Sequence, residues 1–405
     1  MILSLVLLLG LAPALVRAQT PPTDVQSRLQ DLESRVGKLE TAPAPVHINS
    51  FNPSIGMAID TVLRDSNDHA NFDLRGAELN LAAPVDPFVS GWAVINGHED
   101  GIDVEEAAMQ TAALPWGLQV TGGRFFAPFG RLSQWHDHEL SMVDRPNSLL
   151  TYVGGEGQAD GVLVSWLAPT PFFLRLSAGT FSKLGADNNR VAHTDYQGFD
   201  RWTHLVRAHL YTDLTDNVGL DLGASLAWTP KSVFCPSGAC ALNDSWRTLG
   251  GADATLRYMP SAGGLYKGLV WSTEVLQNDE RGFDPFTSLP TGRMLSYSGY
   301  SNVETKVGRM TRLGAFVDLS ELPGQKRDVC RTFAAYWTLE FSEFNRLRLQ
   351  YSRILNSFGG ALAGLPGTDF AGSDLVGLRA GHMISLQWTT VLGYHVHGFR
   401  GRWGA

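Results

Sequence analysis

The stretch WHDHELSMVDRP, which begins at Trp135, places two histidines one residue apart among acidic side chains. His136 and His138 offer two imidazole nitrogens, which zinc and other transition metals bind together with carboxylate oxygens. Acids of the same stretch could supply such oxygens: Asp137, Glu139 and Asp144. The histidine pair therefore predicts a candidate zinc site, in a protein that otherwise carries no sign of a cofactor.

The same residues allow two other interpretations. An esterase or lipase needs a serine, a histidine and a third group that orients the histidine. Ser133 lies near His136 and Ser141 follows, but no GxSxG-like phrase surrounds either serine, so we expect no enzyme. The plainer alternative is a loop in which the histidines are solvated and the acids form hydrogen bonds with Arg145. The choice depends on the elements that position this stretch.

The first residues predict export. The apolar run from Ile2 to Leu11 is too short to span a bilayer as a helix, and Val16 and Ala18 occupy the −3 and −1 positions of a signal-peptidase site. We expect residues 1–18 to form a signal peptide, with an uncleaved anchor as the alternative.

Charge and cysteine content limit the possible partners and cofactors. The net charge of −8 argues against nucleic acid as a partner. Cys235 and Cys240 form the close pair CPSGAC, which could become a disulfide in an oxidising compartment. Two cysteines alone would make an incomplete zinc site, and Cys330 has no predicted role.

A short helix is expected after the signal peptide, within residues 19–46. Apolar residues there follow the 4, 3, 4, 3 spacing of a heptad stripe: Val25, Leu29, Leu32, Val36 and Leu39. Pro43 and Pro45 end the helix. Because so short a helix is marginal alone in water, we interpret it as a periplasmic coiled-coil-like segment that associates, as a trimer, with copies of itself. A spacer helix that touches nothing is the alternative.

From residue 51 to 403 the hydrophobic period changes to two. In PSIGMAIDTVL, Ile55, Met57 and Ile59 share one face, while Ala58 and Asp60 occupy the other. Similar alternation recurs along the whole chain and indicates antiparallel strands. Short connections such as 84–87, 114–117, 168–171 and 342–345 alternate with long polar ones. Tryptophans stand near strand ends: Trp92, Trp116, Trp166 and Trp228.

Short turns on one side, long loops on the other and aromatic girdles are typical of a transmembrane β-barrel. A closed barrel also satisfies every backbone group in lipid. We predict an all-β fold, an antiparallel barrel with 16 strands in preference to 14; a secreted β-sandwich or propeller is the soluble alternative. The long connection from Ala127 to Gly157 follows the fifth expected strand, where it can fold into the lumen.

Residues 123–147, GRFFAPFGRLSQWHDHELSMVDRPN, resemble the phosphate-selective porin O/P-like superfamily of Gram-negative outer-membrane barrels. The segments TLEFSEFNRLRLQYSR (338–353) and ISLQWTTVLGYHVHGF (384–399) look closer to a branch often labelled zinc-regulated outer-membrane proteins. The resemblance implies an integral protein of the Gram-negative outer membrane that contacts lipid and forms a homotrimer. It also implies recognition by the barrel-assembly machinery through Phe399 or Trp403.

These observations favour a porin-like channel for passive diffusion of small hydrophilic solutes or ions. A metal-binding or metal-uptake barrel is the alternative, and an outer-membrane lipase or esterase is a weaker one. Candidate pore-lining or constriction residues are Asp60, Glu78, His136, His138, Asp144, Arg145, Arg175, Arg207, Asp221, Arg346 and Arg348. Because both signs of charge occur among them, phosphate selectivity is not expected.

Overall fold

The computed structural model of the chain describes residues 53–66, 69–98, 101–112, 114–185, 198–234, 241–283, 290–321, 329–355 and 381–393. Several predicted features lie outside the described residues. They are the signal peptide at 1–18, the helix and linker at 19–46, the Cys235–Cys240 pair, Phe399 and Trp403.

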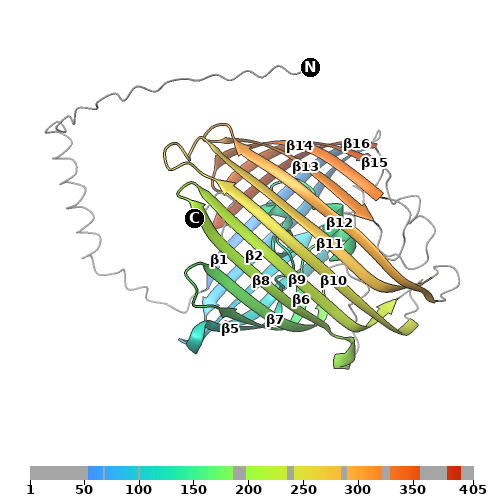
Figure 1. Cartoon of the computed structure of the whole chain (residues 1–405). Helices are drawn as coiled ribbons and strands as arrows, with labels where there is room; N and C mark the ends of the chain where they lie inside the picture. The colour runs from blue at the N-terminus through green and yellow to red at the C-terminus, as the bar shows by residue number, and fades with distance from the viewer. Residues whose placement is uncertain are drawn as a thin grey trace, which may run out of the picture. The chain divides into compact units, whose positions relative to one another are not determined.

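Sixteen described strands pair antiparallel with their chain neighbours and close into one barrel, in which β16 pairs with β1 (Figure 1). They are β1 (Ser54–Ser66), β2 (His69–Pro84), β3 (Val89–His98), β4 (Gly101–Thr111), β5 (Leu118–Phe126), β6 (Gln158–Leu167), β7 (Phe173–Leu184), β8 (Thr203–Thr215), β9 (Val218–Phe234), β10 (Ala241–Tyr258), β11 (Gly268–Phe283), β12 (Pro290–Lys306), β13 (Thr311–Glu321), β14 (Val329–Ser342), β15 (Asn345–Leu355) and β16 (Gly381–Gly393). The predicted 16-stranded antiparallel barrel is confirmed, and the count of 14 is wrong.

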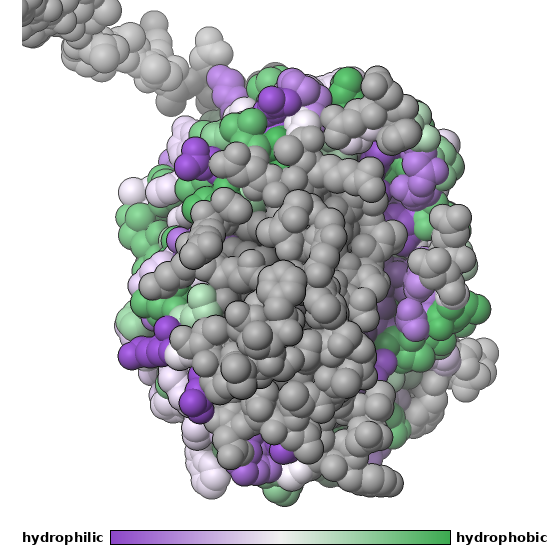
Figure 2. Space-filling view, turned by 90° about the vertical axis from the view of Figure 1, so that its right-hand side faces the viewer, coloured by the Kyte–Doolittle hydropathy of each residue, from purple (hydrophilic) through white to green (hydrophobic). Residues whose placement is uncertain are grey.

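Side chains alternate between the lumen and the outer surface along the strands, because the side-chain period of a β-strand is two. In β14, Thr332, Ala334 and Tyr336 are buried toward the lumen, while Phe333 and Trp337 are exposed on the outside. Exposed hydrophobic side chains recur on neighbouring strands, and Figure 2 shows hydrophobic surface along the flanks of the molecule. The sequence alternation therefore identified the outward faces.

The prediction for Trp92 was wrong. Trp116, Trp166 and Trp228 are exposed as expected of outer aromatics, but Trp92 shares the lumen face of β3 with buried Val94. Its indole Nε1 donates a hydrogen bond to a Glu106 carboxylate oxygen at 2.9 Å, and its ring packs against apolar side chains inside the barrel. Nearness to a strand end suggested a girdle, whereas the position within the alternation decides the face.

Residues 127–157, between β5 and β6, form a loop that folds into the barrel; we refer to it as the inserted loop (Figure 1). It contains the short helices η2 (Leu132–Gln134), η3 (Asp137–Glu139) and α2 (Asn147–Tyr152); η1 (Pro115–Gly117) and η4 (Phe199–Arg201) lie elsewhere. None of the helices in the described part of the chain has the length and apolar character to cross a membrane.

The apolar core of the protein lies between the inserted loop and the barrel wall. The loop contributes Phe129, Leu132, Leu140, Met142, Leu149 and Tyr152, and the wall contributes Phe181, Leu205, Leu249, Leu276 and Phe316. Gly251 of β10 makes room for this packing, since a Cβ there would lie 3.2 Å from the ring of Phe129. Burying each large apolar side chain contributes roughly 1.5–3 kcal/mol, so the packing favours a fixed loop.

Candidate functional site: the inserted loop and its anchors

Two β-bulges direct additional charged side chains toward the inserted loop. In β2, Asp60 of β1 faces Gly76 and Thr61 faces Leu74, so that Arg75 is an extra residue. In β4 the pairing with β3 skips Glu105 in the same way. A bulge inserts one residue into a strand and can redirect its side chain. Sequence alternation missed both residues.

The bulges do leave a signal in the sequence. Outward apolar residues that should be two apart are three apart at each bulge: Leu74 and Ala77 in β2, and Val104 and Ala107 in β4. Such a change of spacing within a strand indicates an inserted residue. It could therefore have identified Arg75 and Glu105.

His136 lies against carboxylates of the wall. Its Nδ1 is 3.0 Å from an oxygen of Glu105 and 3.5 Å from an oxygen of Glu78, and its Nε2 is 3.3 Å from an oxygen of Glu106. His138 Nδ1 is 2.9 Å from the other oxygen of Glu78. His136 is 0 % exposed and His138 is 2 % exposed. The structure therefore brings together the two predicted histidines and Glu78, and adds Glu105 and Glu106.

The electrostatic potential at His136 is strongly negative. Burial alone would lower the pKa of His136, but the carboxylates of Glu78, Glu105 and Glu106 outweigh burial and raise this pKa well above the usual value for histidine. The local backbone also fixes the ring. His136 caps η3, and its backbone N–H donates to the side chain of Glu139 at 3.1 Å. The N–H of Glu139 donates in return to the backbone carbonyl of His136 at 2.9 Å, and these two hydrogen bonds orient the HDHE segment.

Four arginines of the wall hold residues 138–144 of the inserted loop, and we call them the arginine clamp: Arg64, Arg75, Arg346 and Arg348. Arg346 donates to the carbonyl of His138, Arg348 to that of Met142 at 2.9 Å, and Arg75 to that of Val143. Arg64 pairs with the carboxylate of Asp144 at 2.8 Å.

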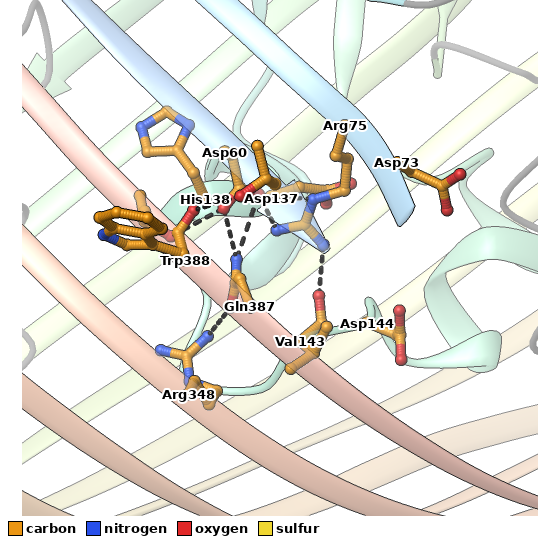
Figure 3. A network of polar contacts seen from close by, with 12 residues as sticks. Asp60, Asp73, Arg75, Asp137, His138, Val143, Asp144, Arg348, Gln387 and Trp388 are labelled. Carbon is orange, nitrogen blue, oxygen red and sulfur yellow. Dashed lines mark hydrogen bonds and ion pairs between the residues drawn. The ribbon is translucent and has the colours of Figure 1, made fainter. Parts of the chain in front are cut away.

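Asp60 and Gln387 tie two members of the clamp together (Figure 3). Arg75 Nε donates to Asp60 at 2.6 Å, Gln387 Nε2 donates to Asp60 at 2.9 Å, and Arg348 donates to Gln387 Oε1 at 2.7 Å. These residues come from β1, β2, β15 and β16, which meet where the barrel closes. The predicted residues Asp60, Arg346 and Arg348 thus contact or support the loop.

Arg145 stabilises the inserted loop from within. Its guanidinium donates to the carbonyls of Leu132 and Trp135 at 2.5 and 2.6 Å, and it pairs with Asp137 at 2.8 Å and Glu156 at 3.4 Å. Only 2 % of its side chain is exposed. Arg145 therefore closes the loop on itself, and its neighbour Asp144, whose side chain is 25 % exposed, is the more accessible of the two.

The start of the inserted loop is fixed on the opposite side of the barrel. The N–H of Gly130 donates to Ser225 Oγ at 3.0 Å, and the N–H of Arg131 donates to a Glu274 oxygen at 3.3 Å. Gly130 has φ +62°, and a Cβ on it would lie 1.7 Å from Glu274. Glycine is therefore favoured here, because a side chain would strain the left-handed backbone and would displace the Glu274 carboxylate that accepts from Arg131.

Three remaining candidates lie apart from the histidines. Arg207 forms a two-point ion pair with Asp253 at 2.7 and 3.1 Å, and Asp221 contacts His209 at 2.9 Å. Arg175 is exposed near the start of β7, opposite His209 of β8, and its guanidinium lies 5.3 Å from the ring centroid of Phe173. Arg207 also donates to Ser225 Oγ at 2.7 Å, the atom that accepts from Gly130, so it supports the start of the loop, whereas Asp221 and Arg175 make contacts within the wall.

The serine predicted as a possible nucleophile is engaged elsewhere. Ser133 is 0 % exposed, and its hydroxyl donates to the backbone carbonyl of Phe129. A hydroxyl committed to a backbone acceptor in a buried loop does not have the arrangement that a serine–histidine pair needs. The geometry therefore favours a structural role for this serine.

No family model matches the chain. A protein of Aquifex aeolicus (strain VF5) described as uncharacterized is 32% identical over 308 residues. That alignment covers 70% of this chain and 64% of the relative, so the chain spans less than two thirds of the relative's length.

Solved structures of outer-membrane proteins have a similar fold. OmpT of Vibrio cholerae in its trimer form matches with a TM-score of 0.53 at 9% identity, over 84% of this chain and 99% of that chain. An anion-selective porin from Comamonas acidovorans matches with a TM-score of 0.51 at 11% identity, over 85% and 99%. Salmonella typhi OmpF matches with a TM-score of 0.50 at 10% identity, again over 85% and 99%. The chain therefore has a porin-like β-barrel fold.

Proposed function

We propose that this protein is an integral channel of a Gram-negative outer membrane that allows small hydrophilic solutes or ions to diffuse passively. The observation that carries the proposal is a closed barrel with hydrophobic side chains outside and charged side chains inside. Such a barrel leaves no unpaired strand edge in lipid. Barrels of this size enclose an aqueous lumen unless loops or side chains fill it.

The inserted loop limits the size of the solute. It is anchored on one side by the arginine clamp and on the other by Ser225 and Glu274, so it divides the lumen. A small cavity of about 30 Å³ lies between the loop and the wall of β13 to β16, and its polar lining is Asp144, Arg145, Asn147, Thr332, Gln350 and Ser352. We assign this side of the loop as the passage.

Within this passage we assign charge selection to Asp144 and Arg64. Their side chains are 25 % and 16 % exposed, and Asp144 also accepts a hydrogen bond from Gln350 at 3.4 Å. A paired carboxylate and guanidinium at a narrow point act on ions of both signs. His136 and His138 are buried away from this cavity, and we assign them to holding the loop; Arg145 lines the cavity but is buried by its contacts within the loop, so we assign it mainly to holding the loop as well.

We further propose a homotrimer in the membrane. Trimer formation is described for the similar OmpT structure, and the predicted heptad segment at 19–46 offers a second means of association. Chemical cross-linking of the purified protein in detergent tests this proposal. Species no larger than the monomer would contradict it.

Planar bilayer recording with the purified, folded protein tests the channel. Stepwise conductance is expected, and reversal potentials in asymmetric salt give the ion preference. The folded state is established independently by the shifted mobility of an unheated barrel in gel electrophoresis. A folded barrel without conductance would refute the channel.

A further inference from the structure

Three side-chain atoms from two strands and the inserted loop converge on one point. They belong to Glu78 of β2, Glu105 of β4 and His136 of the loop, and all lie within 4.8 Å of one another. His136 Nδ1 has carboxylate oxygens at 3.0 and 3.5 Å, although a ring nitrogen can direct one N–H at only one acceptor. In a tetrahedral zinc site with bonds of about 2.0–2.1 Å, neighbouring ligand atoms lie roughly 3.3 Å apart. The distances of 3.0 and 3.5 Å from His136 Nδ1 to the oxygens of Glu105 and Glu78 lie on either side of this ligand–ligand spacing.

The remaining polar atoms of these residues are held in the way that metal ligands usually require. The second ring nitrogen of His136 faces Glu106 at 3.3 Å, as when a carboxylate orients a ligating histidine. The other oxygen of Glu105 accepts from Asn96 at 2.5 Å, and that of Glu78 lies 2.9 Å from His138 Nδ1. Each of the three residues is therefore positioned by a separate partner and presents its other atom to the common point.

Charge and burial also favour a cation. One neutral imidazole and two carboxylates neutralise a divalent ion, which matters because an unbalanced buried charge is costly. His136 is 0 % exposed and Glu78 is 6 % exposed. Carboxylate oxygens of Glu78, Glu105 and Glu106 all lie within 3.5 Å of the His136 ring nitrogens, and this concentration of negative charge stabilises a bound cation. An imidazole nitrogen among the ligands favours zinc or another transition metal over calcium or magnesium.

We propose that Glu78, Glu105 and His136 form a binding site for a divalent transition metal such as zinc, which fixes the inserted loop to β2 and β4. The site differs from the His136–His138 pair predicted from the sequence. His138 orients Glu78, and two wall glutamates complete the ligand set, leaving a fourth position for water. The site is independent of the proposed channel, because it holds the loop whether or not the lumen conducts ions.

Calorimetric titration of the EDTA-treated, folded barrel with Zn²⁺ tests the site. One equivalent is expected to bind to the wild type. His136→Gln should weaken binding at least 100-fold, Glu105→Gln at least tenfold, and Glu106→Gln by 10- to 100-fold. His209→Gln is the matched control. His209 also contacts a carboxylate, that of Asp221 at 2.9 Å, but it lies on another part of the wall. The His209→Gln variant should therefore bind zinc with the affinity of the wild type.

Cobalt supplies a second readout that reports the ligands directly. Co²⁺ at the wild-type site should give the visible absorption of a four-coordinate nitrogen and oxygen site, and Glu105→Gln should remove it. The Glu105→Gln substitution keeps the size of the side chain. It therefore tests whether the site binds metal even if the His136→Gln variant does not fold. A folded wild type that binds neither metal would overturn the proposal. So would equal zinc affinity in the wild type and Glu105→Gln, or loss of binding in His138→Gln without loss in Glu105→Gln.

Discussion

Replacing Arg145 with methionine is expected to release the inserted loop from its closed conformation without unfolding the barrel. The guanidinium binds two loop carbonyls, those of Leu132 and Trp135, and two carboxylates, those of Asp137 and Glu156. Methionine has a similar length but offers no donor. The strands keep their own hydrogen bonds, so the barrel stays folded. The lost contacts of Arg145 therefore shift the equilibrium of the inserted loop from the closed toward the open conformation.

The expected size of the effect follows from these contacts. Breaking a buried ion pair costs about 3–5 kcal/mol, because the remaining partners stay buried without their counter-charge. Each carbonyl left without a donor adds about 1–3 kcal/mol. Some of this cost is recovered when the open loop is hydrated, so we take about 3 kcal/mol as the net change. Since 1.4 kcal/mol corresponds to a factor of ten, the open population should rise roughly 100-fold.

Hydrogen–deuterium exchange with mass spectrometry measures this opening directly. Peptides from 127–157 should exchange about 100-fold faster in Arg145→Met than in the wild type, while peptides from β14 to β16 should be unchanged. Arg293→Met is the control: Arg293 also pairs with a carboxylate, that of Asp279, but 68% of its side chain is exposed, so no change is expected. Equal exchange of the loop in Arg145→Met and the wild type would refute the assigned role.

Three further variants test other parts of the site. Gly130→Ala should displace the start of the inserted loop, because the new Cβ meets the carboxylate of Glu274 and φ is +62°. Hydrogen–deuterium exchange at residues 128–134 should then be faster than in the wild type. Exchange at the wild-type rate would contradict this prediction. Burial and nearby carboxylates raise the pKa of Glu156 well above its usual value, so its folded form binds the proton more tightly and the loop loses stability as pH rises above about 4.5. Glu156→Gln should flatten this dependence of loop exchange on pH, and an unchanged profile would contradict the assignment. Asp144→Asn removes one of the two carboxylates that Arg64 contacts, while Asp73 at 3.2 Å remains, and it removes a negative charge from the passage, so the reversal potential should shift toward anion preference; an unchanged potential would exclude Asp144 from the passage.

The sequence predicted the barrel well because each strand carries its own information. The period of two identifies the outward face of a strand, and a shift of one residue would reverse it. The alternation places Asp60 and Glu78 on the inward face of their strands, and both side chains are buried in the structure. The long loop after the fifth strand was also identified, because its length and polarity differ from those of the short turns.

The contacts across the lumen could not be predicted in this way. Arg348 and Met142, or His138 and Arg346, are more than 200 residues apart in sequence, and their contact depends on closure of the whole barrel. The alternation also predicts which face of the strand a residue occupies, but it does not predict which side chains lie across the lumen from that residue. The apolar lumen wall shows this, because side chains such as Leu276 pack on the loop instead of facing water.

The most direct test of the central claim is the single-channel conductance after removal of the inserted loop. The two ends of the loop are adjacent, because the N–H of Ala127 donates to the carbonyl of Gly157 at 2.8 Å, so a Gly-Gly linker can replace residues 128–156. If the loop restricts the lumen, the shortened barrel should conduct several-fold more than the wild type and admit larger solutes. A folded, shortened barrel with the conductance of the wild type would contradict the account.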